Sequence, residues 1–219
     1  MKKQQFAVIG MGRFGSSVAR TLYGMGYEVL AIDADEQRIQ AVIDEVTHGV
    51  QADTTDEDAL KSIGIRNFDV VVVAIGQDIQ ASILTTLILK ELGVKMLVVK
   101  AQNLHHGKVL SKIGADKVIY PERDMGVRVA HRLISPNILD MIELSDEYSI
   151  IEITAPPQMI GRNLRQLDIR ARYGCTVMAI KNKDGMNVAP RAEDQITDGD
   201  ILVIVGKNED LHQVEVSFQ

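Results

Sequence analysis

Three glycines near the start of the chain carry the clearest chemical signal. Gly10, Gly12 and Gly15 have the spacing G-x-G-x-x-G, after an apolar run at residues 6–9 and before a stretch with helical periodicity. Gly10 would allow a tight turn, Gly12 would let the backbone approach a phosphate, and Gly15 would let the helix pack close to a sheet. Because the first N–H groups of a helix lack partners and its dipole favours anions, this turn is predicted to bind phosphate.

Two charged residues extend this site. Asp33 closes the next apolar run, at the distance from the glycines where a carboxylate can accept hydrogen bonds from a ribose diol. Arg13 lies inside the loop, where a cation is mildly unfavourable at a helix start and therefore indicates a nearby anion. An arginine here favours a ligand with additional phosphate charge over a bare dinucleotide bridge. The alternative is a glycine-rich turn that binds nothing.

Further candidates follow the later apolar runs. Asp53 could meet an adenine amino group, although the polar residues at 55–56 could simply cap the next helix. Ala74, Ile75 and Gly76 end the fourth run, where small side chains would leave room for a flat ring or a ribose.

The elements that must position these residues follow a repeating pattern of apolar run, turn and amphipathic stretch over residues 4–121. Fully apolar runs such as 70–75 predict strands that are buried on both faces, as in a parallel sheet covered by helices. Right-handed crossovers then predict a Rossmann-like, doubly wound sheet of six strands, with the ligand at the carboxyl ends of the strands. Strands are expected at 6–9, 28–32, 49–52, 70–75, 96–99 and 117–120, and helices at 15–25, 36–46, 57–63, 79–92 and 104–113.

The pattern changes after residue 121. The amphipathic stretch 125–144, interrupted by Ser135-Pro136-Asn137, predicts a helix–turn–helix arm. From residue 145 onward a small α+β lobe is expected, with strands at 148–155, 175–181, 186–189 and 200–206 and a helix at 208–216. The expected domains are 1–121, the crossover arm 122–144 and the lobe 145–219. Since about 75 residues form only a small core, dimerisation through the lobe is expected.

Composition excludes several classes of protein. The 219 residues include 24 basic and 30 acidic side chains, and a net charge of -6 argues against binding nucleic acid. The longest unbroken apolar run, 70–75, is far too short to span a bilayer, and no signal peptide opens the chain. Cys175 is the only cysteine and is expected to be a buried apolar residue. We therefore expect a cytoplasmic protein.

Several longer segments resemble a known family. The opening Phe-Ala-Val-Ile-Gly-x-Gly-Arg-Phe-Gly is similar to that of the RCK (also called KTN) family, and within it to the cytosolic regulatory subunits of bacterial Ktr potassium-uptake systems. The resemblance covers essentially the whole chain. It also rests on the segments 64–68, 73–76, 79–82, 100–103, 113–116, 121–126 and 144–150.

The resemblance implies a regulatory role. Such subunits form a ring of eight, built from dimers, on the cytoplasmic face of a separate potassium-translocating membrane protein. ATP and ADP compete for the Rossmann site, and ATP favours the active ring. Glu122 would lie near the terminal phosphate, often facing it from the neighbouring subunit, with a bridging Mg²⁺ or Na⁺. The expected nucleotide contacts are Gly10, Gly12, Arg13, Phe14, Gly15, Asp33, Asp35, Asp53, Ala74, Ile75, Gly76, Lys100 and Glu122.

The resemblance also implies a second ligand, cyclic di-AMP, which binds a dimer of C-terminal lobes and inactivates transport. The residues expected to contact it share a loop and a strand end, where arginines could pair with phosphates or stack on adenine. They are Ile169, Arg170, Arg172, Ala189 and Pro190. From the residues alone, a solvated arginine loop is the alternative.

An enzyme is the main competing hypothesis. An NAD(P)-dependent dehydrogenase would need a substrate domain larger than the lobe, and no tyrosine has a lysine four positions later. A phosphoryl-transfer enzyme would need the G-x-x-x-x-G-K-[ST] loop, which the sequence lacks. NAD(H) as a regulatory ligand stays open, because Asp33 would suit its ribose equally well. We therefore expect a binding protein without catalytic residues.

Overall fold

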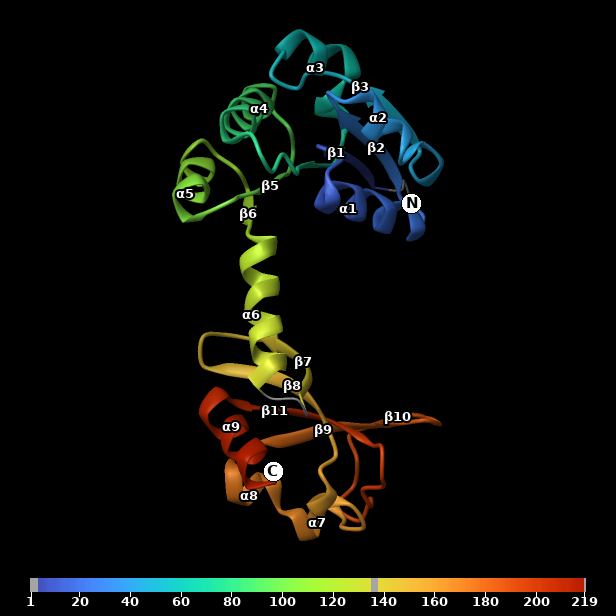
Figure 1. The fold of residues 1–219 in the computed structure, drawn as a ribbon, viewed down its shortest axis with the longest axis vertical. Coiled ribbons are helices and arrows are strands. Elements are labelled where there is room, and N and C mark those ends of the chain that lie inside the picture. Colours follow the sequence, from blue (N-terminus) through green and yellow to red (C-terminus); the bar gives the residue numbers. More distant parts are fainter. Residues whose placement is uncertain (1–3, 135–137, 219) are drawn as a thin grey trace. The chain divides into compact units, whose positions relative to one another are not determined.

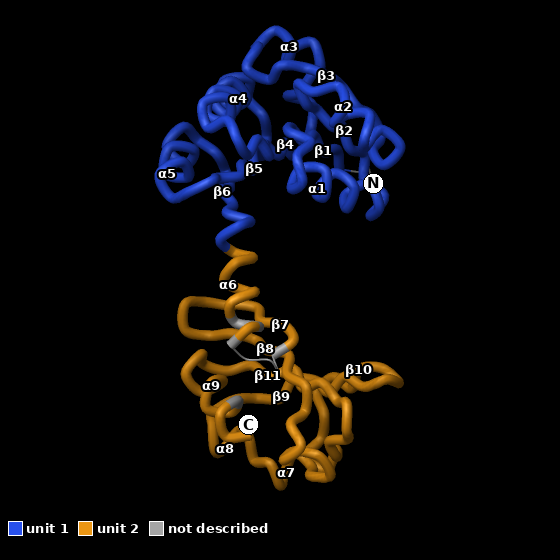
Figure 2. Tube along the Cα trace, in the orientation of Figure 1, with its two compact units in different colours: residues 1–123 blue, residues 124–219 orange. Residues whose placement is uncertain are grey.

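The structure is a computed structural model that describes residues 4–134 and 138–218. The chain divides into two compact units, residues 1–123 and 124–219, each with its own sheet (Figure 2).

Unit 1 has the predicted Rossmann-like architecture. Its six strands are all parallel and lie in the order β3-β2-β1-β4-β5-β6, with helices in the connections (Figure 1). The elements are β1 (Gln5–Ile9), α1 (Arg13–Gly24), β2 (Glu28–Asp33), α2 (Glu36–Gln40), η1 (Ile43–Glu45), β3 (His48–Gln51), α3 (Glu57–Ile63), η2 (Ile65–Asn67), β4 (Val70–Val73), α4 (Ile79–Glu91), β5 (Leu97–Lys100), α5 (Leu104–Lys112) and β6 (Lys117–Ile119). The helix expected over 36–46 is shorter, because Val42 leaves the helical region and is buried in the core.

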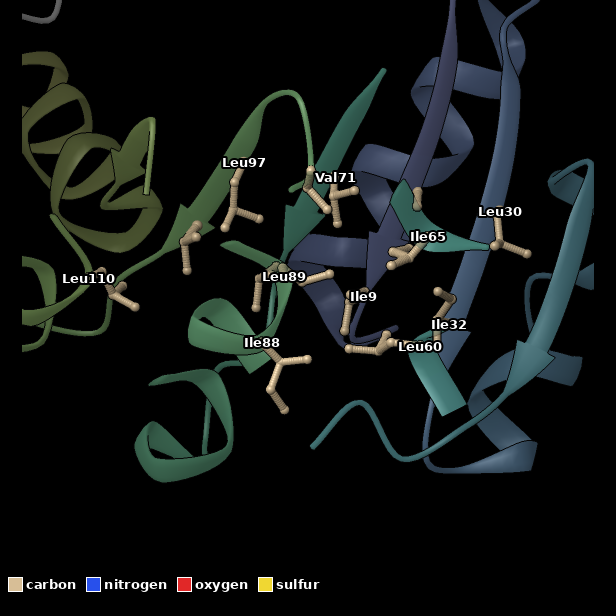
Figure 3. Packing of buried hydrophobic residues seen from close by; sticks show 14 of the residues in the cluster. Ile9, Leu30, Ile32, Leu60, Ile65, Val71, Ile88, Leu89, Leu97 and Leu110 are labelled. Carbon is tan, nitrogen blue, oxygen red and sulfur yellow. The ribbon is translucent and has the colours of Figure 1, made fainter. Parts of the chain in front are cut away.

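Both faces of this sheet are buried, as the apolar strands predicted. Alternate residues of each strand point to opposite faces, so Ile9 and Val8 belong to different clusters. Leu60 of α3, Leu89 of α4 and Leu110 of α5 pack with Ile9 on one face (Figure 3). On the other face, Ala19 of α1 and Ile39 of α2 pack with strand residues that include Val8. The helices that follow β1 and β4 are therefore held firmly against the sheet, with their first turns at its carboxyl edge.

The start of α1 lies unusually close to β1. A Cβ atom built on Gly15 would lie 1.9 Å from the carbonyl oxygen of Gly10 and 3.0 Å from the Cβ of Ala74. Gly10 itself has a φ of 91°, a conformation that other residues rarely adopt. The tight turn and the close helix packing predicted for these two glycines are both present.

Unit 2 begins within helix α6 (Pro121–Ile134), and the next described element corrects a prediction. The second half of the expected helical arm is a strand, β7 (Ile138–Glu143), which pairs antiparallel with β8 (Tyr148–Thr154). Its apolar residues also fit a helical spacing, but pairing with β8 decides the conformation because Met141 packs on the lobe core. Residues 135–137, expected to form the turn of the arm, lie outside the described part of the chain.

The rest of unit 2 is the expected α+β lobe. Its sheet has the order β10-β9-β11-β8-β7. Cys175 is buried beside Gly206, and this burial raises the pKa of its thiol to about 11. The remaining elements are η3 (Pro157–Met159), α7 (Leu164–Leu167), α8 (Ile169–Tyr173), β9 (Thr176–Asn182), β10 (Gly185–Val188), β11 (Ile201–Lys207) and α9 (Asn208–Ser217).

Within residues 4–134 and 138–218, no helix combines the length and the apolar character that crossing a bilayer requires.

The contact between α1 and β1 leads to a stability prediction. Gly15→Ala should destabilise the protein by about 2 kcal/mol or more, because its Cβ would collide with a backbone atom that cannot rotate away. Gly24→Ala, in the last turn of the same helix, would meet no atom within 4 Å. The free energy of unfolding of this variant should stay within about 1 kcal/mol of that of the unchanged protein. Urea denaturation of both variants tests this, and equal midpoints would contradict it.

Candidate functional site

The glycine loop leaves an open space in front of helix α1. Gly12 is the N-cap of α1, and no side chain among the described residues caps this end of the helix. A Cβ built on Gly12 would meet no atom within 4 Å. Unlike Gly10 and Gly15, this glycine is therefore not required by the packing of the protein itself. Since the first N–H groups of a helix lack partners within it and its dipole favours negative charge, this end of α1 is suited to an anion.

Asp33 ties the loop to the second strand. Its buried carboxylate accepts hydrogen bonds from the backbone N–H of Met11, at 2.6 Å, and of Asp35, at 2.9 Å. The guanidinium of Arg38 lies 3.7 Å away. A carboxylate has about four lone-pair sites, so Asp33 keeps the capacity to accept bonds from a ribose. It therefore also has a structural role, holding the glycine loop in place, that the sequence did not reveal.

Asp35 and Asp53 take part in local turns at the same edge of the sheet. Asp35 is the N-cap of α2 and accepts a hydrogen bond from the backbone of Gln37. Asp53 accepts hydrogen bonds from the hydroxyl and the backbone N–H of Thr55, and these bonds lower the pKa of Asp53. Asp56 caps α3, as the sequence predicted for this position.

On the other side of the loop, Lys100 and Glu122 form an ion pair. Lys100 is the last residue of β5, and Glu122 belongs to the first turn of α6, after β6. The Lys100 ammonium lies 5.7 Å from the centroid of the Phe14 ring, and a Cβ on Gly76 would lie 3.4 Å from it. The hydrogen bond from Lys100 is the main cause that lowers the pKa of Glu122, and the nearby charge of Arg13 adds to it.

The structure therefore brings most of the predicted nucleotide residues to one edge of the sheet. Ala74 is buried, and Ile75 and Gly76 are partly exposed there. Sequence reasoning placed both Lys100 and Glu122 at the nucleotide but missed that they bind each other. The signal that could have revealed the pair is the occurrence of opposite charges just after two neighbouring parallel strands.

The candidate site in the lobe differs from its prediction. Residues 169–173 form helix α8 and not a loop, and Ile169 is buried in the lobe core. Arg170 and Arg172 are exposed, and Arg172 lies 5.9 Å from the Tyr173 ring. Ala189 has a φ of 56°, and Pro190 is partly exposed.

The described side chains do not form a metal site by themselves. In the part of the chain that the structure describes, no group of three His, Cys, Asp or Glu side chains could hold a metal ion. Glu122, the residue expected to face a cation, is already paired with Lys100. A cation at Glu122 would therefore depend on the oxygen atoms of a bound phosphate and on water.

Comparison with known proteins agrees with the two-unit architecture. Residues 6–121 match the family model of the TrkA-N domain, and residues 148–219 match that of the TrkA-C domain. Ktr system potassium uptake protein A of Bacillus subtilis (strain 168) is 50% identical over 215 residues, which cover 98% of this chain and 97% of that protein. Ktr system potassium uptake protein C of the same organism is 52% identical over 213 residues, or 97% of this chain and 96% of that protein.

A solved structure shares the fold. The crystal structure of the GsuK RCK domain aligns with a TM-score of 0.68 and 16% identity, covering 99% of this chain and 48% of that chain. Since both domain models match and the identity extends over nearly the full length of two Ktr proteins, the chain belongs to the RCK (KTN) family of proteins that join a TrkA-N domain to a TrkA-C domain.

Proposed function

We propose that this protein is a nucleotide-sensing regulatory subunit that controls a separate potassium-translocating membrane protein. Its identity of 50% with a Ktr system potassium uptake protein, over nearly the whole length of both, supports the role in potassium uptake. The protein acts by binding and not by catalysis. It works in the cytoplasm, on the inner face of the cell membrane.

The ligand that fits the Rossmann site best is an adenine nucleotide. Its phosphates would lie in the open space before Gly12, where the N–H groups and the dipole of α1 favour an anion. Asp33 would accept hydrogen bonds from the ribose, and Asp53 would lie near the adenine. The single observation that carries this assignment is the space at Gly12, because no packing contact requires a glycine there.

The response would depend on the terminal phosphate. ATP favours the active state and ADP the inactive state, and a ligand shifts such an equilibrium only by binding one state better than the other. Arg13 and Glu122 are the charged side chains that would sense the additional phosphate, since Arg13 is close enough to Glu122 to contribute to the lowering of its pKa. A Mg²⁺ or Na⁺ ion would relieve the repulsion between Glu122 and the phosphate.

Assembly into a ring of dimers, eight subunits in all, completes the proposal. Helix α6 carries exposed apolar side chains, Met125, Val127, Val129 and Leu133, and Leu133 is 79% exposed. A second copy of the chain would cover such a surface. In the lobe, Arg170 and Arg172 would bind cyclic di-AMP as an inhibitor, together with Ala189 and Pro190.

NAD(H) as the regulatory ligand is the second candidate. The observation in its favour is Asp33, whose position suits the ribose of a dinucleotide as well as that of ATP. Calorimetric comparison of ATP, ADP and NADH on the purified protein decides between them.

The space at Gly12 gives the first test of the site. Gly12→Ala should raise the Kd for ATP and ADP at least about tenfold, because a methyl group would occupy the place of a phosphate oxygen. The protein should stay folded and lose at most about 1 kcal/mol, since alanine is a poorer N-cap than glycine but the new Cβ meets no atom and the φ of −70° suits alanine. Calorimetry and thermal melting measure the two effects, with Gly24→Ala as the control. Unchanged nucleotide affinity would reject the site.

Arg13→Ala should separate the two nucleotides. The Kd for ATP should rise about tenfold and that for ADP about threefold or less, because a guanidinium near the terminal phosphate is lost. Arg20→Ala is the matched control, since Arg20 lies on the same helix but pairs with Glu45. Titration with both nucleotides measures the ratio. An equal loss for ATP and ADP would show that Arg13 does not sense the terminal phosphate.

The lobe site can be tested independently. Arg170→Ala in the full chain should lower the affinity for cyclic di-AMP at least about tenfold, because an exposed arginine that could pair with a phosphate is removed. The affinity for ATP should not change. Arg165→Ala removes another exposed arginine of the lobe, one that pairs with Glu193, and should have little effect. Calorimetry that detects no cyclic di-AMP binding to the unchanged protein would refute the site.

A further inference from the structure

The position of the Lys100–Glu122 pair has a consequence for ligand choice. In a sheet with the order β3-β2-β1-β4-β5-β6, a dinucleotide lies across the carboxyl edge, one half on each side of the glycine loop. Asp33 lies on the side of the first half, at the end of β2. Lys100 and Glu122 lie on the other side, after β5 and β6, where the second half of a dinucleotide would be placed.

Lys100 cannot simply be left without a partner. Its side chain is only 10% exposed, and a buried ammonium that loses its counter-charge is strongly unfavourable. The ammonium pairs with the carboxylate of Glu122 and lies near the face of Phe14, and a Cβ built on Gly76 would lie 3.4 Å from it. Of these three, only Glu122 carries a negative charge. A ligand that separates the pair must therefore supply an anion in its place.

Glu122, in contrast, can leave at little cost. Its side chain is 69% exposed, so its carboxylate can return to water or meet a cation when Lys100 takes another partner. The two members of the pair thus differ in burial: Lys100 is buried, whereas Glu122 is exposed and can be exchanged for another partner.

We infer that the Lys100–Glu122 pair determines the specificity of the nucleotide site. A ligand whose phosphate chain extends past the glycine loop replaces Glu122 as the partner of Lys100. The uncharged nicotinamide and ribose of NADH offer no such replacement, so the pair disfavours dinucleotides. This inference rests on the proposed nucleotide site and assigns its selectivity to two residues. Because Glu122 lies in the first turn of α6, the exchange acts first on the helix that leads out of unit 1.

The test is calorimetry of the full chain with ATP, ADP and NADH in the presence of a chelator, so that no cation can bridge Glu122 and phosphate. Glu122→Gln frees Lys100 from its competing anion and should strengthen ATP binding about threefold or more, with a smaller effect on NADH. Lys100→Gln removes the cation and should lower the affinity for ATP about tenfold, while the affinity for NADH should stay the same or increase.

Two matched controls remove ion pairs outside the candidate nucleotide site. Glu57→Gln breaks the pair of Glu57 with Lys61 on α3, and Lys95→Gln breaks the pair of Lys95 with Asp69. Neither should change the ratio of ATP to NADH affinity. Thermal melting of every variant shows that it is folded, and Glu122→Gln alters an exposed side chain, so it remains informative if Lys100→Gln does not fold.

The outcomes separate the inference from the function on which it rests. If the unchanged protein binds ATP, the inference is overturned when Glu122→Gln leaves ATP binding unchanged or weaker in chelator. Equal weakening of ATP and NADH by Lys100→Gln overturns it as well. If the unchanged protein binds no nucleotide, the proposed function fails and the inference fails with it.

Discussion

The contact between Gly15 and the carbonyl oxygen of Gly10 is the constraint on which the site depends. It holds the first turn of α1 directly above the end of β1, so the free N–H groups of the helix open onto the carboxyl edge of the sheet. Asp33 then fixes the loop from the other side through the N–H of Met11. One close packing contact and one buried hydrogen bond thus shape the loop before any ligand arrives, which lowers the ordering cost of binding.

The charged side chains on the two sides of the candidate nucleotide site are held in different ways. On the side of β2, the carboxylate of Asp33 is occupied by backbone donors that never leave the protein. On the side of β5, the ammonium of Lys100 is held by a side chain that is largely exposed. The first arrangement is rigid and suits a part common to all adenine nucleotides. The second is exchangeable and suits a part in which nucleotides differ.

The sequence alone predicted those features of the fold and the site that depend on residues close together in the chain. The central strands β1, β2, β4 and β5 were predictable because each is a nearly continuous apolar run, whereas the edge strands β3 and β6 are short and partly exposed. Gly10 and Gly15 were predictable because a tight turn and a close helix leave few other choices. Strand β7 was missed because its apolar spacing also fits a helix, and only its pairing with β8 decides the matter. The burial of Ile169 and the pairing of Lys100 with Glu122 depend on contacts between distant segments, which periodicity does not contain.

The three glycines of the loop differ in what keeps them in the sequence. Gly10 is held by its backbone angle and Gly15 by its contact with a carbonyl, so both are required by any chain that folds this way. Gly12 faces empty space, so no packing contact requires a glycine there. In a lineage that lost the ligand, Gly12 would be free to change without loss of folding, while its two neighbours would not. In relatives of this protein, a larger residue in place of Gly12 would therefore indicate that the nucleotide site is no longer used.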